Sequence, residues 1–133
     1  MYIINKEGEI TKKKRADQEL PSFFLTETIK QIILFRASLI ISKKVIDVLP
    51  RIYNVHCVRL SEYAGLGGIA RALKQKDYEQ MAVMHRVVEE IDQGEIIQQA
   101  PYRLDPEKTY RENEDMAYEA GMQMILDYLE RRK

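Results

Sequence analysis

The sequence predicts an α/β domain in which a mostly parallel sheet is flanked by helices. Short apolar runs typical of strands alternate along the chain with segments whose apolar residues recur at helical spacing. Residues 39–42 are apolar on both alternate positions, as expected for a parallel strand that is covered on both faces. With 133 residues, 45% of them apolar, the chain can bury a core. We therefore expect residues 1–133 to form a single domain.

Composition limits the class of function. The 21 basic and 21 acidic residues give a net charge of zero, so the chain lacks the basic excess that collects phosphates of a nucleic acid or an anionic membrane. A single cysteine excludes an intrachain disulfide framework and a cysteine-rich zinc site. No apolar run approaches the roughly 20 residues that span a bilayer, and the N-terminus lacks the apolar stretch of a secretory signal. We expect a cytoplasmic protein that binds neither nucleic acid nor membrane.

The N-terminal part is interpreted as a short strand pair followed by a helix. Residues 2–4 have strand composition, a Lys-Glu-Gly turn follows at 6–8, and the chain then returns briefly. The basic run at 12–15 is interpreted as solvated loop. Helical spacing of apolar residues predicts a helix over residues 22–36, with Ser22 as its candidate cap. Those positions are Phe24, Leu25, Thr28, Ile29, Ile32, Ile33 and Phe35.

The central part alternates strands and helices. After the strand at 39–42 we expect a short helix at 45–49, ended by Pro50, and a strand at 52–56. A glycine-rich turn at 65–68 leads into a helix over residues 69–75.

The C-terminal part is predicted to contain two strands and a long helix. The strands are expected at 81–88 and 94–99. Thr109 and Glu112 have the spacing of a capping box, which opens the last helix. Its expected inner stripe is Met116, Ala117, Ala120, Met124, Ile125, Tyr128 and Leu129.

Polar side chains gather where a ligand crevice is expected in such a sheet. Asn54 and His56 are two residues apart in a predicted strand, at its C-terminal end, so their side chains share one face. Asp92 lies in a loop between two further strands. An amide, an imidazole and a carboxylate suit acyl transfer: the first two stabilise an oxyanion, and the carboxylate orients the imidazole.

Other interpretations of these residues are weaker. A lone histidine in a strand is more often a hydrogen-bonded structural residue than a catalyst, and we interpret His85 in this way. Cys57 follows His56 directly and therefore points to the opposite face, which argues against a thiol–imidazole dyad. His56, His85 and Asp92 lack the close spacing of familiar metal motifs, so we expect no metal.

Several motifs agree in order and spacing with one known family. They are Asn54-Val55-His56, Tyr63-Ala64-Gly65-Leu66, Ala72-Leu73, His85, Glu90-Ile91-Asp92-Gln93-Gly94 and Ile97-Gln98-Gln99. Together they resemble the catalytic half of the folate-dependent formyltransferases, of the type of glycinamide ribonucleotide formyltransferase in purine biosynthesis. The resemblance is strongest over residues 39–129. It implies a Rossmann-like formyltransferase fold.

The resemblance also implies a reaction and its residues. The chain would transfer a formyl group from 10-formyltetrahydrofolate to a primary amine of a small molecule. Asn54, His56 and Asp92 match the catalytic residues of the family. Residues beside the folate would be Lys43, Lys44, Val87, Glu89 and Gly94.

The departures from the family pattern point to alternatives. The family begins with a strand, a glycine-rich loop and a helix that hold the substrate phosphate, and this part is missing here, so we expect a truncated domain. After His56 the family has Pro-Ser-Leu-Leu-Pro, whereas this chain has residues 57–61, which place the cation Arg59 nearby. One alternative is a catalytically inactive, folate-binding remnant. Another is a homo-oligomer that covers the open sheet edge or completes a shared site.

Overall fold

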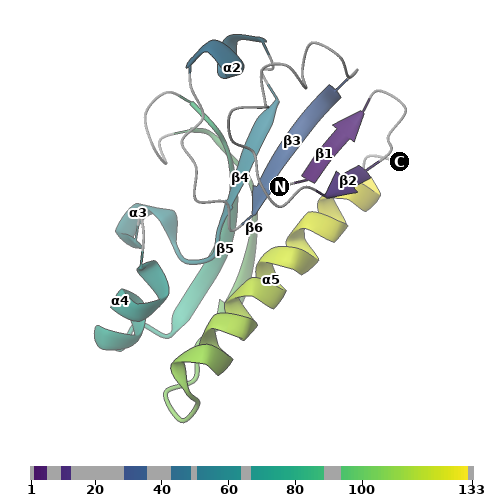
Figure 1. The fold of residues 1–133 in the computed structure, drawn as a ribbon. Helices are drawn as coiled ribbons and strands as arrows, with labels where there is room; N and C mark the ends of the chain where they lie inside the picture. Colours follow the sequence, from purple (N-terminus) through teal and green to yellow (C-terminus); the bar gives the residue numbers. More distant parts are fainter. Residues whose placement is uncertain are drawn as a thin grey trace. The chain divides into compact units, whose positions relative to one another are not determined.

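The computed structural model describes residues 2–5, 10–12, 29–35, 43–48, 51–63, 67–88 and 94–131 (Figure 1). The strands are β1 (Tyr2–Asn5), β2 (Ile10–Lys12), β3 (Ile29–Phe35), β4 (Ile52–His56), β5 (Glu79–Arg86) and β6 (Ile96–Arg103). The helices are α2 (Lys43–Val48), α3 (Leu60–Tyr63), α4 (Gly68–Lys74) and α5 (Tyr110–Arg131). The α/β class with flanking helices is confirmed.

The sheet is mixed rather than mostly parallel. Among the described residues, the strands are hydrogen-bonded in the order β2-β1-β3-β4-β5-β6. The pairs β1–β2, β1–β3 and β5–β6 are antiparallel. The chain divides into two compact units, Met1–Asn54 with Arg86–Glu95, and Val55–His85 with Ile96–Lys133.

The first unit contains the strand pair expected near the N-terminus. The helix expected over 22–36 is wrong for residues 29–35, and residues 22–28 and 36 lie outside the described residues. Residues 29–35 of that stretch form strand β3, which pairs with β1. Ile32, Ile33 and Leu34 are consecutive and all buried, so both faces of the strand are covered. A short apolar run matches a buried strand as well as a helix, and β-branched isoleucines favour the strand. The expected strand at 39–42 lies outside the described residues.

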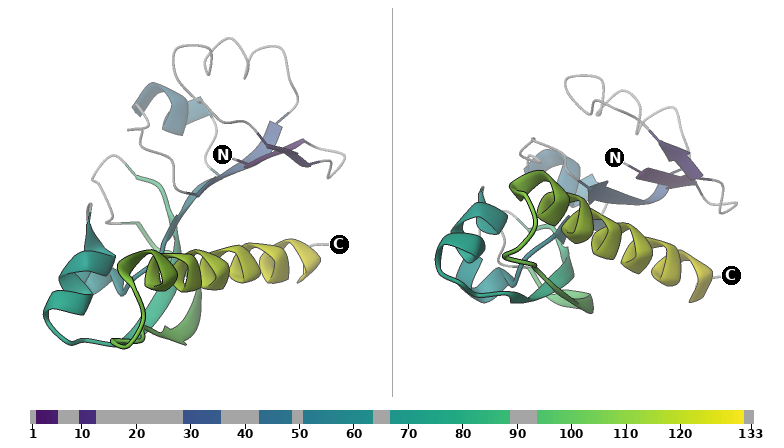
Figure 2. Two further views of the ribbon diagram at one scale, coloured as in Figure 1. Left: turned by 60° about the horizontal axis from the view of Figure 1, so that its bottom comes forward. Right: turned by 90° about the horizontal axis from the view of Figure 1, so that it is seen from below.

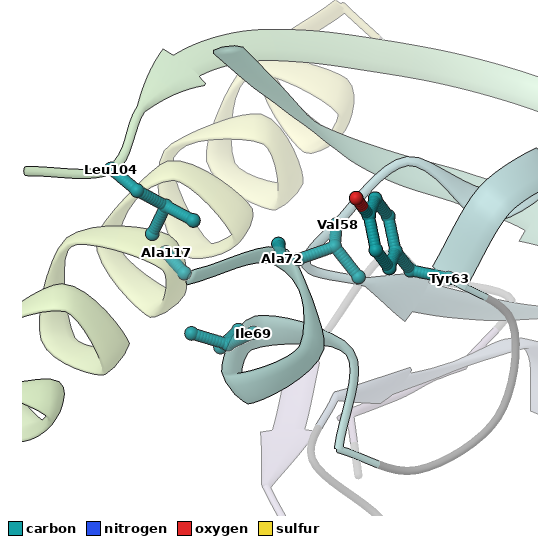
Figure 3. Packing of buried hydrophobic residues seen from close by; sticks show 6 residues of the cluster. All are labelled: Val58, Tyr63, Ile69, Ala72, Leu104 and Ala117. Atoms are coloured by element: carbon teal, nitrogen blue, oxygen red, sulfur yellow. The ribbon is translucent and has the colours of Figure 1, made fainter. Parts of the chain in front are cut away.

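The second unit carries a core between short helices, the strand pair β5–β6 and the long helix. Buried side chains from α3, α4 and α5 and from the segments that follow β4 and β6 form one cluster (Figure 3): Val58, Tyr63, Ile69, Ala72, Leu104 and Ala117. Helix α5 packs on β6 and α4 (Figure 2). Strands β5 and β6 shift register by one residue between Met84 and His85. This bulge lies next to the loop that joins the two strands.

Helix α5 begins as the sequence predicted. The backbone N–H of Glu112 donates to Thr109 Oγ1 at 3.1 Å, and the N–H of Thr109 donates to Glu112 Oε1 at 3.2 Å. This reciprocal pair is the predicted capping box. The buried residues of α5 are Asn113, Ala117, Gly121, Met124, Ile125 and Tyr128, while Met116, Ala120 and Leu129 are half-buried.

The other predicted elements are confirmed to within two residues at the ends that the structure describes, except that β6 continues to Arg103. Helix α3 lies where the sequence indicated no element. No helix in the described part of the chain is long and apolar enough to cross a membrane.

Candidate active site

Strand β4 carries the first two candidate residues. Ile52, Tyr53 and Val55 are buried, whereas Asn54 and His56 are half-buried. Successive side chains of a strand point to opposite faces, so Asn54 and His56 lie on one face of β4. The strand thus presents an amide and an imidazole together, as the period of two predicted.

A backbone carbonyl holds the ring of His56. Its Nε2 atom lies 2.6 Å from the carbonyl oxygen of Tyr63, the last residue of α3. A carbonyl oxygen only accepts hydrogen bonds, so Nε2 carries the hydrogen and donates it. In the neutral ring, Nδ1 then holds the lone pair, and it is the nitrogen left to exchange a proton with a ligand.

Tyr63 is itself anchored by its side chain. The residue is 2% exposed and packs in the core cluster beside Val58 (Figure 3). Its hydroxyl donates to Asp77 Oδ2 at 2.7 Å. This hydrogen bond stabilises the charged carboxylate and the neutral phenol, so it lowers the pKa of Asp77 and raises the pKa of Tyr63.

Arg59 joins the same group of side chains. Its Nη2 donates to Asp77 Oδ2, and its Nε donates to Glu62 Oε2 at 3.2 Å. Its Nη1 donates to the carbonyl oxygen of Glu79 at 2.7 Å. The cation that the sequence placed near the site is therefore bound to three acceptors of its own unit. It ties the segment around α3 to the start of β5.

The glycine-rich turn brings α4 close to the Tyr63 carbonyl. Gly67 caps α4 with a φ of 73°, in the left-handed region that favours glycine. A Cβ atom on Gly68 would lie 2.5 Å from Val58 Cγ2 and 3.1 Å from the carbonyl oxygen of Tyr63. The absence of a side chain at Gly68 lets the backbone pass close to the group that holds His56.

Backbone hydrogen bonds are described at the two ends of the segment that carries the third candidate residue. Asp92 and Glu89 lie outside the described residues. The N–H of Arg86 donates to the carbonyl of Glu95 at 2.8 Å, and the N–H of Val87 donates to the carbonyl of Ile52 at 2.8 Å. The described ends of the segment that carries Asp92 are thus held by backbone hydrogen bonds.

A comparison with protein families decides how this geometry is interpreted. The family model described as formyl transferase matches residues 2–129, nearly the whole chain. The chain belongs to the formyltransferase family. The match begins well before residue 39, from which the resemblance was expected to be strongest.

Similar proteins within the formyltransferase family carry two different names. A methionyl-tRNA formyltransferase of Thermotoga neapolitana is 32% identical over 94 residues, which cover 69% of this chain and 30% of that protein. A phosphoribosylglycinamide formyltransferase of Haemophilus influenzae is 36% identical over 74 residues, which cover 56% of this chain and 35% of that protein. The chain therefore spans about a third of the length of these relatives.

Solved structures share the formyltransferase fold. The phosphoribosylglycinamide formyltransferase of Streptococcus pneumoniae TIGR4 superposes with a TM-score of 0.77 at 21% identity, covering 84% of this chain and 62% of the other. A formyltetrahydrofolate deformylase of Pseudomonas syringae pv. tomato superposes with a TM-score of 0.71 at 21% identity, covering 91% and 42%. These similarities establish the fold.

The described residues predicted to lie beside the folate are found in helix α2 and at the ends of the segment between β5 and β6. Lys43 forms an exposed ion pair with Asp47 at 2.9 Å, one turn along α2, and Lys44 lies in the same helix. The N–H of Val87 donates to the carbonyl oxygen of Ile52 in β4. Gly94 lies against the carbonyl of Arg86. Folate contact by these residues stays a prediction.

His85 and Cys57, which the sequence indicated to be structural rather than catalytic, differ in their burial. His85 is buried at 2% exposure in β5. Cys57 is half-buried at the edge of the core cluster, and its carbonyl accepts a hydrogen bond from the Tyr102 hydroxyl. In the described ranges, no group of three His, Cys, Asp or Glu is placed to hold a metal ion.

Sequence reasoning missed the residues that support His56. Tyr63 entered only as part of a motif, and Asp77 was not singled out. They are 14 residues apart, and their hydrogen bond depends on how α3 and α4 pack. The usable signal was the pair Tyr63 and Gly68, an aromatic residue followed by a glycine-rich turn.

Proposed function

We propose that the chain transfers a formyl group from 10-formyltetrahydrofolate to a primary amine of a small molecule. The observation that carries this proposal is the Asn54–His56 pair on one face of β4 in a chain of the formyltransferase family. The pair combines an amide donor with an imidazole whose Nε2 is already engaged by the protein. These are the groups that acyl transfer to an amine requires.

The proposed reaction needs one proton relay. The amine nitrogen attacks the formyl carbon, and the carbonyl electrons move to oxygen. The Asn54 amide stabilises the negative charge there, and the His56 ring does so once it has taken up the amine proton. The bond from the formyl carbon to N10 of the folate then breaks. The proton that the amine loses moves through His56 to N10, so the products are the formamide and tetrahydrofolate. In this proposal Asp92 stabilises the positive charge of His56 while the ring holds the proton.

Names of similar proteins support the choice of donor. The neighbouring deformylase is named for formyltetrahydrofolate. We propose that the folate lies beside Val87, Glu89 and Gly94, which follow β5 in the chain, and beside Lys43 and Lys44. This placement comes from the family resemblance.

The net charge of the chain is the basis on which we propose the class of the formyl acceptor. The relatives are named for methionyl-tRNA and phosphoribosylglycinamide. Because this chain has equal numbers of basic and acidic residues, it lacks the basic excess that binds a tRNA backbone. We therefore propose a small amine of the glycinamide type, as in purine biosynthesis.

Calorimetry and a transfer assay test the proposal in sequence. The purified chain is titrated with 10-formyltetrahydrofolate and then assayed for tetrahydrofolate release with glycinamide ribonucleotide, with methionyl-tRNA, or with no amine. We expect binding, and release only with glycinamide ribonucleotide. His56→Ala should abolish release, whereas Gln99→Ala, at an exposed position of β6, should not change it.

Each other outcome contradicts a stated part of the proposal. Absence of binding at high micromolar 10-formyltetrahydrofolate would show that this compound is not the formyl donor. Binding of the folate without release of tetrahydrofolate would support the alternative of a catalytically inactive, folate-binding remnant. Release of tetrahydrofolate with methionyl-tRNA would show that the formyl acceptor is a tRNA rather than a small amine. Release without an amine would show that the reaction is a hydrolysis.

A further inference from the structure

The carbonyl of Tyr63 is the described hydrogen-bond partner of the His56 ring, at 2.6 Å from Nε2. We propose that Tyr63 and Asp77 are positioning residues that fix His56 in its Nε2–H form, so that Nδ1 is the nitrogen that moves protons. The positioning rests on the geometry alone, and the use of Nδ1 in formyl transfer rests on the proposed function.

The position of the Tyr63 carbonyl is set from two sides. On one side the Tyr63 side chain is buried, and its hydroxyl donates to Asp77 at 2.7 Å. Asp77 is in turn held by Arg59 and by its own N–H, which donates to the carbonyl of Ala72 at 2.9 Å in α4. On the other side Gly68 leaves the room that the carbonyl occupies. A carbonyl held in this way is a fixed acceptor rather than one that follows the ring.

A fixed acceptor changes what the imidazole can do. A free neutral imidazole can carry its hydrogen on either nitrogen, and only one of the two forms suits a given reaction. With Nε2–H donated to Tyr63, Nδ1 accepts a proton from the attacking amine when the ring is neutral. Once charged, the ring returns that proton from Nδ1 to N10 of the folate. Nε2 keeps its hydrogen throughout, and the proton count of the reaction is unchanged.

This arrangement limits the direct contacts of His56 during the reaction. Nδ1 has one hydrogen or one lone pair, so it serves a single partner at a time. The oxygen of the formyl group and the carboxylate of Asp92 therefore cannot both be bound strongly to Nδ1 at one moment. We infer that Tyr63, rather than Asp92, selects the form of the ring.

The test is nitrogen-15 spectroscopy of the imidazole rings, which needs neither folate nor amine. The chain has 2 histidines, so His56→Gln assigns the signals and the His85 ring serves as an internal reference. In the unaltered chain we expect neutral His56 in the Nε2–H form alone, with slow exchange of that hydrogen with water. Tyr63→Phe keeps the ring and its packing but removes the bond to Asp77. We expect this exchange to become about tenfold faster, as for the loss of one hydrogen bond.

Matched variants separate positioning from general loosening. Tyr110→Phe makes the same change on a tyrosine that is 49% exposed, and it should leave the His56 signals unchanged. Gly68→Ala adds a Cβ that would press on Val58 and the Tyr63 carbonyl. It should speed the exchange as Tyr63→Phe does, and Asp77→Asn gives a second variant if either protein fails to fold.

Two results would overturn the proposal. One is an Nδ1–H form of neutral His56 in the unaltered chain. The other is unchanged His56 exchange in folded Tyr63→Phe or Asp77→Asn protein. Because these spectra are recorded without substrate, a chain that shows the expected signals but transfers no formyl group contradicts the proposed function and leaves the positioning of His56 intact.

Discussion

Gly94 lies so close to the backbone of Arg86 that a Cβ atom at position 94 would come within 1.6 Å of the Arg86 carbonyl oxygen. The same stretch is closed by the hydrogen bond from the N–H of Arg86 to the carbonyl of Glu95. The glycine of the Asp-Gln-Gly sequence is thus required by space. The segment with the proposed catalytic Asp92 begins and ends at this contact.

Replacing Gly94 by alanine should therefore push the backbone at position 94 away from Arg86. Because a Cβ cannot fit against the Arg86 carbonyl, the backbone must move, and we expect a loss of about 2 kcal/mol in the free energy of unfolding. Urea unfolding measures this loss. Gln99→Ala, at an exposed site of β6, should change stability by no more than about 0.5 kcal/mol. Equal midpoints for Gly94→Ala and the unaltered chain would show that Gly94 does not lie against the Arg86 carbonyl in solution.

The Tyr63–Asp77 contact should make stability depend on pH in the acid range. The hydrogen bond from Tyr63, followed by the contact with Arg59, lowers the pKa of Asp77 below its ordinary value of 3.8. A carboxylate whose pKa is lower in the folded chain contributes stability above the unfolded pKa. That contribution is lost as pH falls through the folded pKa.

Asp77→Asn isolates this effect from the titration of other carboxylates. We expect the variant to have a lower melting temperature than the unaltered chain at pH 7, with the difference shrinking once the pH falls below 3.8. Melting temperatures recorded from pH 7 to pH 3 provide the comparison. A difference that stays constant over this range would show that the charge of Asp77 does not contribute.

Local signals explain which elements the sequence predicted. Strand β4 was predicted from the short run at 52–56, in which Asn54 and His56 are the two polar side chains. Helix α5 was found because Thr109 and Glu112 form the predicted capping box. In both cases the residues that determine the element are close together in the chain, so a local sequence pattern is enough to predict it.

Elements decided by packing were not predictable in the same way. Ile32 and Ile33 in β3 are buried on a strand covered on both faces, and the same residues also fit a helical spacing. The antiparallel pairing of β1 with β3 joins segments far apart in the chain. Neither property leaves a local mark in the sequence.

The candidate site likewise contains residues that the local sequence predicted and contacts that depend on tertiary packing. Asn54 and His56 were predicted from their period and from the family resemblance. The contact from His56 to the Tyr63 carbonyl and the contact from Arg59 to Asp77 depend on the placement of α3 and α4. The sequence placed the cation Arg59 near His56, and in the structure its guanidinium donates to Asp77, Glu62 and the carbonyl of Glu79.

The capping box of α5 should contribute measurably to stability. Thr109→Ala removes the acceptor of the Glu112 N–H, and we expect a loss of about 1 kcal/mol in the free energy of unfolding. Thr109→Ser keeps the hydroxyl and should retain most of that stability. Urea unfolding of both variants tests the cap, and equal losses for alanine and serine would assign the effect to the methyl group instead.

Asn54→Asp tests the amide of the candidate site with almost no change in shape. The proposed role of Asn54 is to donate an N–H to the oxyanion, and a carboxylate in its place only accepts hydrogen bonds. Loss of one such donor lowers kcat about 100-fold or more, with a smaller effect on KM because the charge develops only in the transition state. Steady-state release of tetrahydrofolate measures both constants. Gln99→Glu makes the same amide-to-carboxylate change at an exposed position and should keep the original kcat. If Asn54→Asp also kept it, the oxyanion would have to be stabilised by other donors, and the role of β4 would reduce to His56.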